Sequence, residues 1–344
     1  MTGLMNSVRR VARLAVVVMA TVLLVAPAWA VDGDELKALG YASHQESVHC
    51  GVLNRDLQVK ILSPLAYNWD DEQYCVLYAM DSRSDEQVAA AVAAFDNQRD
   101  DVLPILIVRV PDAVTQSADL ADCMAGTLFP FVEADYRVVP YRILAGNRVD
   151  ARMALTLGAN YSNHFHSILA EAESTEAIPA DQLESLIKGL TAQTTFPRTI
   201  CAATMAGAPD LPAFQQIANA LKTRPGTTVR FVVQNADIPA DQKEGGLLLY
   251  KGLIGTFSDW YVKKDVGELG LEGVQTHYDH LGDMVGVELP VPQELINRLA
   301  RALLDKSDYV KLLNVLKFNA VKHPASAKAH AALGQGWEVN NRVR

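Results

Sequence analysis

Short apolar runs alternate with amphipathic segments over most of the chain. Seven runs predict β-strands: Leu57–Leu62, Tyr74–Met80, Leu103–Val110, Tyr141–Ala145, Ser167–Ala170, Thr199–Ala203 and Thr228–Val233. Several are continuously apolar, which is typical of strands covered on both faces. Helical patterns lie between them, over Glu86–Phe95, Leu120–Asp135, Gln182–Leu190 and Phe214–Leu221. This alternation predicts an α/β fold with a mostly parallel sheet, helices on both faces, and an antiparallel start near Val48 and Leu57.

The C-terminal part of the chain is purely helical in pattern. Two amphipathic segments, 292–304 and 309–321, predict helices, and Ser326 is the expected N-cap of a third. Small residues in the third helix resemble the junction between tetratricopeptide-type helices, although such arrays need about three repeats to be stable alone. We therefore expect an α/β domain over residues 31–288 and a short helical, tetratricopeptide-like extension over residues 289–344.

The first thirty residues differ from the rest of the chain. Three arginines precede an apolar run from Leu14 to Pro27, and Ala28-Trp29-Ala30 follows with small residues at the two positions that a signal peptidase reads. The run is shorter than the roughly 20 residues that span a bilayer. Residues 1–30 are therefore predicted to be a signal peptide of a periplasmic or secreted protein, with no stable membrane span after cleavage. An uncleaved inner-membrane anchor is the alternative.

Composition narrows the class of protein. Of the 344 residues, 49% are hydrophobic and 21% are charged, which excludes a disordered chain or a polytopic membrane protein. The formal net charge of -9 argues against nucleic acid as a partner, because phosphate requires a basic surface.

Four cysteines, Cys50, Cys75, Cys123 and Cys201, follow the predicted signal peptide. An oxidising compartment permits disulfides, and four cysteines allow three connectivities. Cys75 and Cys201 lie in apolar, strand-like runs, where a buried free thiol is equally ordinary. No C-x-x-C pair occurs, so the sequence indicates no zinc or redox site, and we expect neither a metal nor a cofactor.

The segment Ile143–Ala151 reads as a strand, a tight turn at Gly146 and the start of a helix. Ligands of parallel α/β sheets bind at the carboxyl ends of the strands. A nucleophile elbow of the G-x-S-x-G type occupies a junction of this kind. The segment is therefore the first candidate for a functional site.

Three other segments carry a resemblance to a known family. Gln73–Asp81 looks like a strand that ends at an oxyanion loop, and Leu128–Arg137 is similar to a helix with a P-x-I-E-x-x-Y pattern. Leu249–Leu253 is similar to the helix that follows a catalytic histidine. In this order and spacing, the segments resemble the esterase family of α/β-hydrolases that includes the siderophore and feruloyl esterases. The resemblance covers roughly residues 45–335 and implies an α/β-hydrolase fold.

The catalytic positions depart from that family. Gly146 matches the first glycine of the elbow, but Arg148 stands at the position of the serine and Asp150 at that of the next glycine. An arginine side chain stays protonated and cannot attack a carbonyl group. No G-x-S-x-G occurs elsewhere in the chain. The elbow is therefore interpreted as degenerate.

The histidine of the family is missing as well. No histidine occurs between Ser167 and Thr276, although the resemblance implies one near residues 241–244. Asp237 would correspond to the acid of the triad, as a vestige without a histidine to orient. We expect an exported, esterase-like pseudoenzyme that acts as a binding or accessory protein. The alternatives are an exported carboxylic-ester hydrolase with rearranged catalytic groups, and an interaction module that binds a protein through its C-terminal helices.

The degenerate elbow indicates what kind of ligand the protein binds. The first N–H groups of the following helix, with Arg148 and Val149, favour a small anionic ligand. A solvent-facing Arg148 is the alternative. Other polar groups are expected to be structural: His277 and His280 with Asp283 by packing, His164 and His166 at the surface or at a strand edge, and Glu171 and Glu173 as solvated loop carboxylates. The aromatic residues Tyr250, Phe257, Trp260 and Tyr261 are expected in the core.

N-terminal sequencing tests the predicted signal peptide. Protein recovered outside the cytoplasm should begin at Val31, because cleavage follows the A-x-A pattern. Retention of Met1 in a membrane fraction would show an anchor instead.

Overall fold

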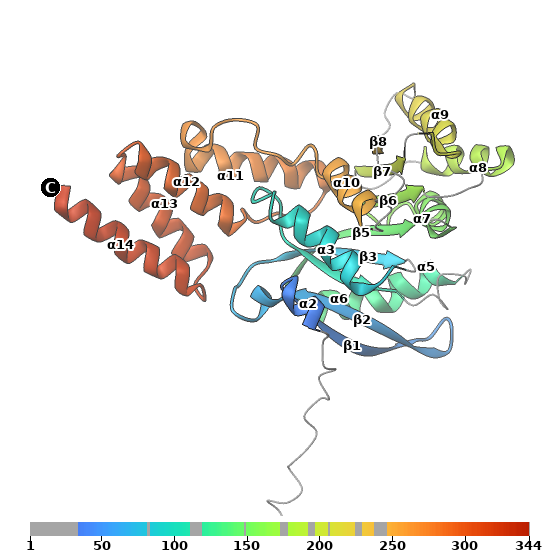
Figure 1. Cartoon of the computed structure of the whole chain (residues 1–344), viewed down its shortest axis with the longest axis horizontal. Coiled ribbons are helices and arrows are strands. Elements are labelled where there is room, and N and C mark those ends of the chain that lie inside the picture. The colour runs from blue at the N-terminus through green and yellow to red at the C-terminus, as the bar shows by residue number, and fades with distance from the viewer. Residues whose placement is uncertain are drawn as a thin grey trace, which may run out of the picture.

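A computed structural model describes residues 34–80, 83–110, 119–147, 149–172, 178–191, 197–205, 207–223, 229–236 and 246–343. In these parts of the chain, eight strands form one sheet at the centre of the molecule (Figure 1). The strands are β1 (Tyr41–Cys50), β2 (Arg55–Pro64), β3 (Tyr74–Met80), β4 (Ile105–Arg109), β5 (Val138–Asn147), β6 (Ser167–Ala172), β7 (Arg198–Met205) and β8 (Val229–Ala236).

The strand order in the sheet is β1-β2-β4-β3-β5-β6-β7-β8. β2 pairs antiparallel with both β1 and β4, and the other neighbours are parallel. The predicted parallel sheet with an antiparallel start is confirmed. Because β3, β5, β6, β7 and β8 run in the same direction, their carboxyl ends share one edge of the sheet.

Helices cover both faces of the sheet, as predicted. One face carries α5 (Leu120–Cys123), a π-helical turn (Met124–Leu128), α6 (Phe129–Asp135), α7 (Val149–Asn160), α8 (Ala180–Leu190) and α9 (Leu211–Lys222). The other carries α3 (Asp85–Asp96), α10 (Leu247–Thr256) and α11 (Val266–Val285). Successive side chains of β3 point to opposite faces of the sheet. Val76 and Tyr78 belong to the buried cluster on one face, and Leu77 and Ala79 belong to the cluster on the other. This explains why β3 is continuously apolar.

The C-terminal helices lie beyond the edge of the sheet at which β3 and β5 begin, on the left of Figure 1. They are α12 (Gln293–Asp305), α13 (Tyr309–Lys322) and α14 (Ala327–Val343). Leu295 and Leu299 of α12 lie in the same buried cluster as Leu77 of β3, so the extension shares its core with the sheet. The predicted cap of the last helix is confirmed, since Ser326 Oγ accepts a hydrogen bond from the Ala329 N–H at 3.2 Å.

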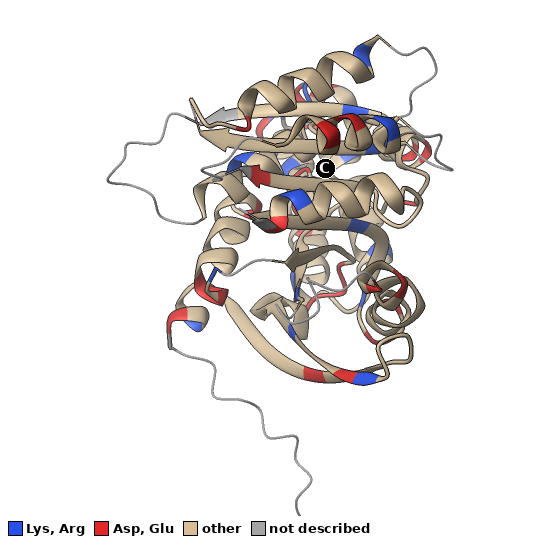
Figure 2. Ribbon diagram, turned by 90° about the vertical axis from the view of Figure 1, so that its right-hand side faces the viewer, with Lys and Arg blue, Asp and Glu red and all other residues tan. Residues whose placement is uncertain are grey.

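The distribution of charge and the lengths of the apolar helices complete the description of the fold. Acidic and basic residues are interspersed along its helices and strand ends (Figure 2). None of the helices in the described ranges is long and apolar enough to cross a membrane.

One disulfide, Cys50–Cys123, joins the end of β1 to the end of α5 across 5.7 Å between the Cα atoms. Cys75 of β3 and Cys201 of β7 are buried free thiols, in agreement with their apolar surroundings in the sequence. Burial raises the pKa of Cys201 to about 12, so this thiol is neutral and unreactive near neutral pH.

Candidate functional site

The junction between β5 and α7 forms the sharp turn that the sequence predicts. β5 ends at Asn147 and α7 begins at Val149, with one residue between them. A Cβ atom on Gly146 would overlap the carbonyl group of Asp150, so the close approach of the helix to the strand requires glycine here. The backbone constraint of a strand–turn–helix elbow is therefore present.

The predicted site residues are only partly placed by the structure. Asp150 lies in the first turn of α7 and is half-buried, close to Gly146. Val149 begins the same helix. Arg148 and Asp237 lie outside the described residues, so the roles assigned to them from the sequence stay predictions.

A buried ion pair lies beside this junction. Arg83, in the loop after β3, donates two hydrogen bonds to Glu171 near the end of β6, with N–O distances of 2.7 and 2.9 Å. The side chains are only 4% and 1% exposed. This parallel, two-point geometry is the strongest arrangement available to an arginine and a carboxylate. The expectation that Glu171 is a solvated loop carboxylate is wrong, because the Arg83 guanidinium takes the place of water. Glu173 lies outside the described residues.

The order of the strands determines where this pair lies. β3 and β6 are not neighbours, because β5 separates them, with Met80 of β3 beside Gly146 and Glu171 of β6 beside Asn147. Adjacent strands are about 4.8 Å apart. A side-chain bridge from the β3 loop to β6 must therefore pass over the carboxyl end of β5, next to the elbow.

The loop that carries Arg83 is fixed from the other side. Arg109, the last residue of β4, donates a hydrogen bond to the Arg83 carbonyl oxygen at 2.6 Å and forms an ion pair with Asp85 at 3.3 Å. Ser84 and Gln87 form a capping box at the start of α3. These contacts hold the Arg83 backbone in place, so the ion pair is part of a rigid arrangement.

A second ionic contact spans the same edge of the sheet. Asp210, at the start of α9 after β7, is 2% exposed, and its Oδ1 lies 3.7 Å from Arg152 Nη2 of α7. Burial is the main cause of a raised pKa at Asp210, and Arg152 opposes it. Sequence reasoning missed this residue because it placed the acidic group at Asp237, after β8.

The histidines are not positioned to act as a base at this edge. His164 and His166 precede β6 and so lie at the opposite, amino end of the sheet. His166 is buried rather than at the surface, and burial together with Arg142 lowers its pKa to about 3. His277 Nε2 lies 2.8 Å from the carbonyl oxygen of Trp260, which confirms its expected packing role.

The aromatic residues after the sheet pack as predicted. Phe257 and Trp260 are buried, with ring centroids 4.9 Å apart in an edge-to-face arrangement. Tyr141 of β5 contacts both rings. Phe257 and Trp260 therefore belong to the core, while Tyr250 and Tyr261 are half-buried against it.

The architecture is similar to that of several solved structures. An IroE-like serine hydrolase from Shewanella oneidensis has a TM-score of 0.65 at 14% sequence identity, covering 81% of this chain and 98% of that protein. An uncharacterised protein from Capnocytophaga ochracea has a TM-score of 0.57 at 14% identity, covering 81% and 84%. A ferulic acid esterase has a TM-score of 0.47 at 14% identity, covering 62% and 98%. No family model matches the sequence, and no curated protein matches it.

The similarity to the serine hydrolase, together with the strand order, establishes the fold. The chain has an α/β-hydrolase-like fold with a mostly parallel eight-stranded sheet and additional C-terminal helices. This is the fold that the sequence resemblance implied.

The buried ion pair generates a prediction on stability. The variant Glu171→Gln removes the carboxylate that accepts two hydrogen bonds from the buried Arg83 guanidinium, which should lower the free energy of unfolding by about 3–5 kcal/mol. The double variant Arg83→Met, Glu171→Leu removes both charges and should be much closer to wild type. Urea denaturation measures both.

An exposed pair provides the matched control. Glu294 contacts Lys328, and both side chains are more than half exposed. Glu294→Gln should change the free energy of unfolding by less than about 1 kcal/mol. Equal losses for Glu171→Gln and Glu294→Gln would contradict a strong role for the buried pair.

Proposed function

We propose that this chain is an exported, esterase-like protein that binds a small anionic ligand at the carboxyl edge of its sheet and does not hydrolyse esters. The observation that carries the proposal is the position of the Arg83–Glu171 pair over the end of β5. This is the edge where ligands of parallel α/β sheets bind.

The ion pair opposes an ester substrate on physical grounds. A reacting carbonyl oxygen needs hydrogen-bond donors within about 3 Å, supplied by a preorganised site. The Arg83 guanidinium already directs two of its nitrogens to Glu171. Separating the pair for a substrate would break two charge-assisted hydrogen bonds between buried groups, at a cost of several kcal/mol.

The sequence supplies the rest of the chemical argument. Arg148 stands where the elbow would carry a nucleophile, and its guanidinium cannot be deprotonated at ordinary pH. The segments that follow β6, β7 and β8 contain no histidine before His277. Without a nucleophile and a base, the first step of the serine-hydrolase mechanism, attack of an activated hydroxyl on the ester carbonyl, does not take place.

An anion is the ligand that this edge favours. The start of α7 provides backbone N–H groups and the positive end of a twelve-residue helix. Arg148 precedes that helix in the sequence and adds a positive charge. Export is supported by the N-terminal pattern and by the Cys50–Cys123 disulfide, because disulfides persist in oxidising compartments.

The proposal predicts binding without turnover. A panel of short- and long-chain acyl esters should be hydrolysed at the buffer rate by the mature protein. Arg148→Ser should not restore hydrolysis, because the base is also absent. Acetate and longer carboxylates, titrated by calorimetry, should bind wild type, and Arg148→Ala should weaken binding at least tenfold.

Two results would contradict the proposal. Turnover above the buffer rate by wild type would show that catalytic groups are present elsewhere in the chain. Equal carboxylate binding by wild type and Arg148→Ala, or no binding by either, would remove the anion site. Lys222→Ala, a change on α9 in an exposed side chain, serves as a control for unspecific loss of positive charge.

A further inference from the structure

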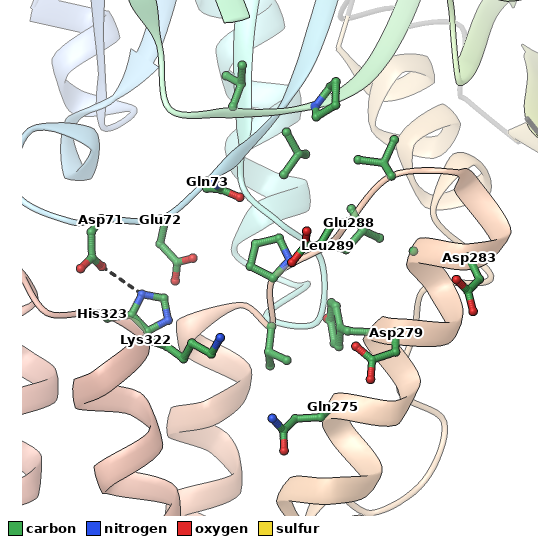
Figure 3. A pocket seen from close by; sticks show the side chains of 18 of the residues that line it. Asp71, Glu72, Gln73, Gln275, Asp279, Asp283, Glu288, Leu289, Lys322 and His323 are labelled. Carbon is green, nitrogen blue, oxygen red and sulfur yellow. Dashed lines mark hydrogen bonds and ion pairs between the residues drawn. The ribbon is translucent and has the colours of Figure 1, made fainter. Parts of the chain in front are cut away.

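A cavity lies at the opposite edge of the sheet from the elbow. It has a volume of about 1090 Å³, is open to solvent on one side, and is lined by the residues before β3, the start of β5, α11 and the end of α13 (Figure 3). Its lining comes from both the sheet and the C-terminal helices. The cavity is therefore separate from the carboxyl edge and depends on the docked helical extension.

Glu72 is a buried carboxyl group of this cavity. The residue is 9% exposed, and its Oε1 accepts a hydrogen bond from the Gln293 N–H at 2.6 Å. Its Oε2 is buried and has no hydrogen-bond partner among the described residues. Figure 3 shows the carboxyl group directed toward the cavity. Burial is the main cause that raises the pKa of Glu72, to about 8, so without a nearby cation the carboxyl group keeps its proton at neutral pH.

His323 contributes a second buried atom. The residue is 5% exposed, and its Nδ1 lies 2.9 Å from Asp71 Oδ1. Asp71 is fixed in turn, because its Oδ2 accepts a hydrogen bond from the Ala325 N–H at 2.9 Å. A carboxylate at Nδ1 favours the tautomer with the proton on that nitrogen, which leaves Nε2 as an acceptor. Within the described part of the chain, Nε2 has no hydrogen-bond partner.

The charged side chains around Glu72 Oε2 and His323 Nε2 determine whether the cavity favours a cationic or an anionic ligand. Asp279, Asp283 and Glu288 add exposed carboxylates to the lining, while Lys322 adds one ammonium group. Apolar side chains such as Leu289 and Phe318 complete the wall. Among the described residues, no group of three or more histidine, cysteine or acidic side chains is arranged to hold a metal ion. An acidic cavity with apolar walls favours an organic cation over an anion or a metal.

We propose that this cavity binds an alkylammonium group whose N–H donors contact Glu72 Oε2 and His323 Nε2. An ammonium group carries three donors and no acceptor, which matches two acceptor atoms that are otherwise unpaired. The positive charge favours the ionised form of the buried Glu72, which gives up its proton when the ammonium group binds, and the alkyl body contacts the apolar wall. This site is independent of the function proposed for the carboxyl edge.

Three probes with the same alkyl body and different head groups test the proposal. Calorimetric titration should show binding of n-hexylammonium and little or none of 1-hexanol or hexanoate. Glu72→Gln keeps an oxygen for the Gln293 N–H but replaces Oε2 by a donor, and should weaken hexylammonium binding at least tenfold. Glu272→Gln, on α11 but outside the cavity lining, should bind as wild type does.

A second variant keeps the test decisive if Glu72→Gln does not fold. Asp279→Asn with Asp283→Asn removes two exposed carboxylates from the mouth and should weaken hexylammonium binding two- to fivefold at low salt. Circular dichroism verifies the fold of each variant. The proposal is overturned by the absence of hexylammonium binding to wild type, by equal binding of hexanoate, or by unchanged affinity in the folded variants.

Discussion

The ion pair between Arg83 and Glu171 constrains the whole carboxyl edge of the sheet. It links the loop after β3 to β6 and crosses β5 between them. Because both side chains are buried, their attraction is weakly screened, and loss of either charge would remove two charge-assisted hydrogen bonds from a dry environment. Arg109 then fixes the Arg83 backbone, so this edge is held by charges from β4, the β3 loop and β6.

The same fold can therefore retain the backbone of an elbow while its side chains change role. Gly146 still permits the close approach of α7 to β5, which is a requirement of chain geometry and not of catalysis. The chemistry of such a junction depends on the side chains that surround it. Here those side chains include Arg83 and Glu171, which are paired with each other. This pairing is one reason why we propose that a protein with a hydrolase-like architecture does not hydrolyse esters.

The sequence predicts a structural element well where residues close together in the chain determine that element. The continuous apolar runs predicted β3 and its neighbours, and Ser326 was recognised as a cap from its position before a helix. The helical segment α11 was not predicted, because Gly267, Gly270 and Gly273 interrupt its pattern, and Gly270, with a φ of 70°, divides it into two helices at a kink. Such a break lowers helix propensity, and packing against the core compensates for it.

The site residues were harder to predict because their partners are distant in sequence. Glu171 has the local pattern of a solvated strand end, whereas its partner Arg83 lies 88 residues away. The contact between Asp71 and His323 spans 252 residues and exists only because the C-terminal helices dock on the sheet. No periodicity within one segment contains such information. The elbow, by contrast, was found because strand, glycine and helix are contiguous.

The most direct test of the account is labelling of the wild-type protein with a serine-directed fluorophosphonate, followed by intact-mass spectrometry. The reagent modifies a serine only where a base activates the hydroxyl and donors stabilise the developing charge. The account predicts no mass increase under conditions in which an active serine esterase is labelled fully. Stoichiometric addition of one phosphonyl group to the folded protein would contradict it.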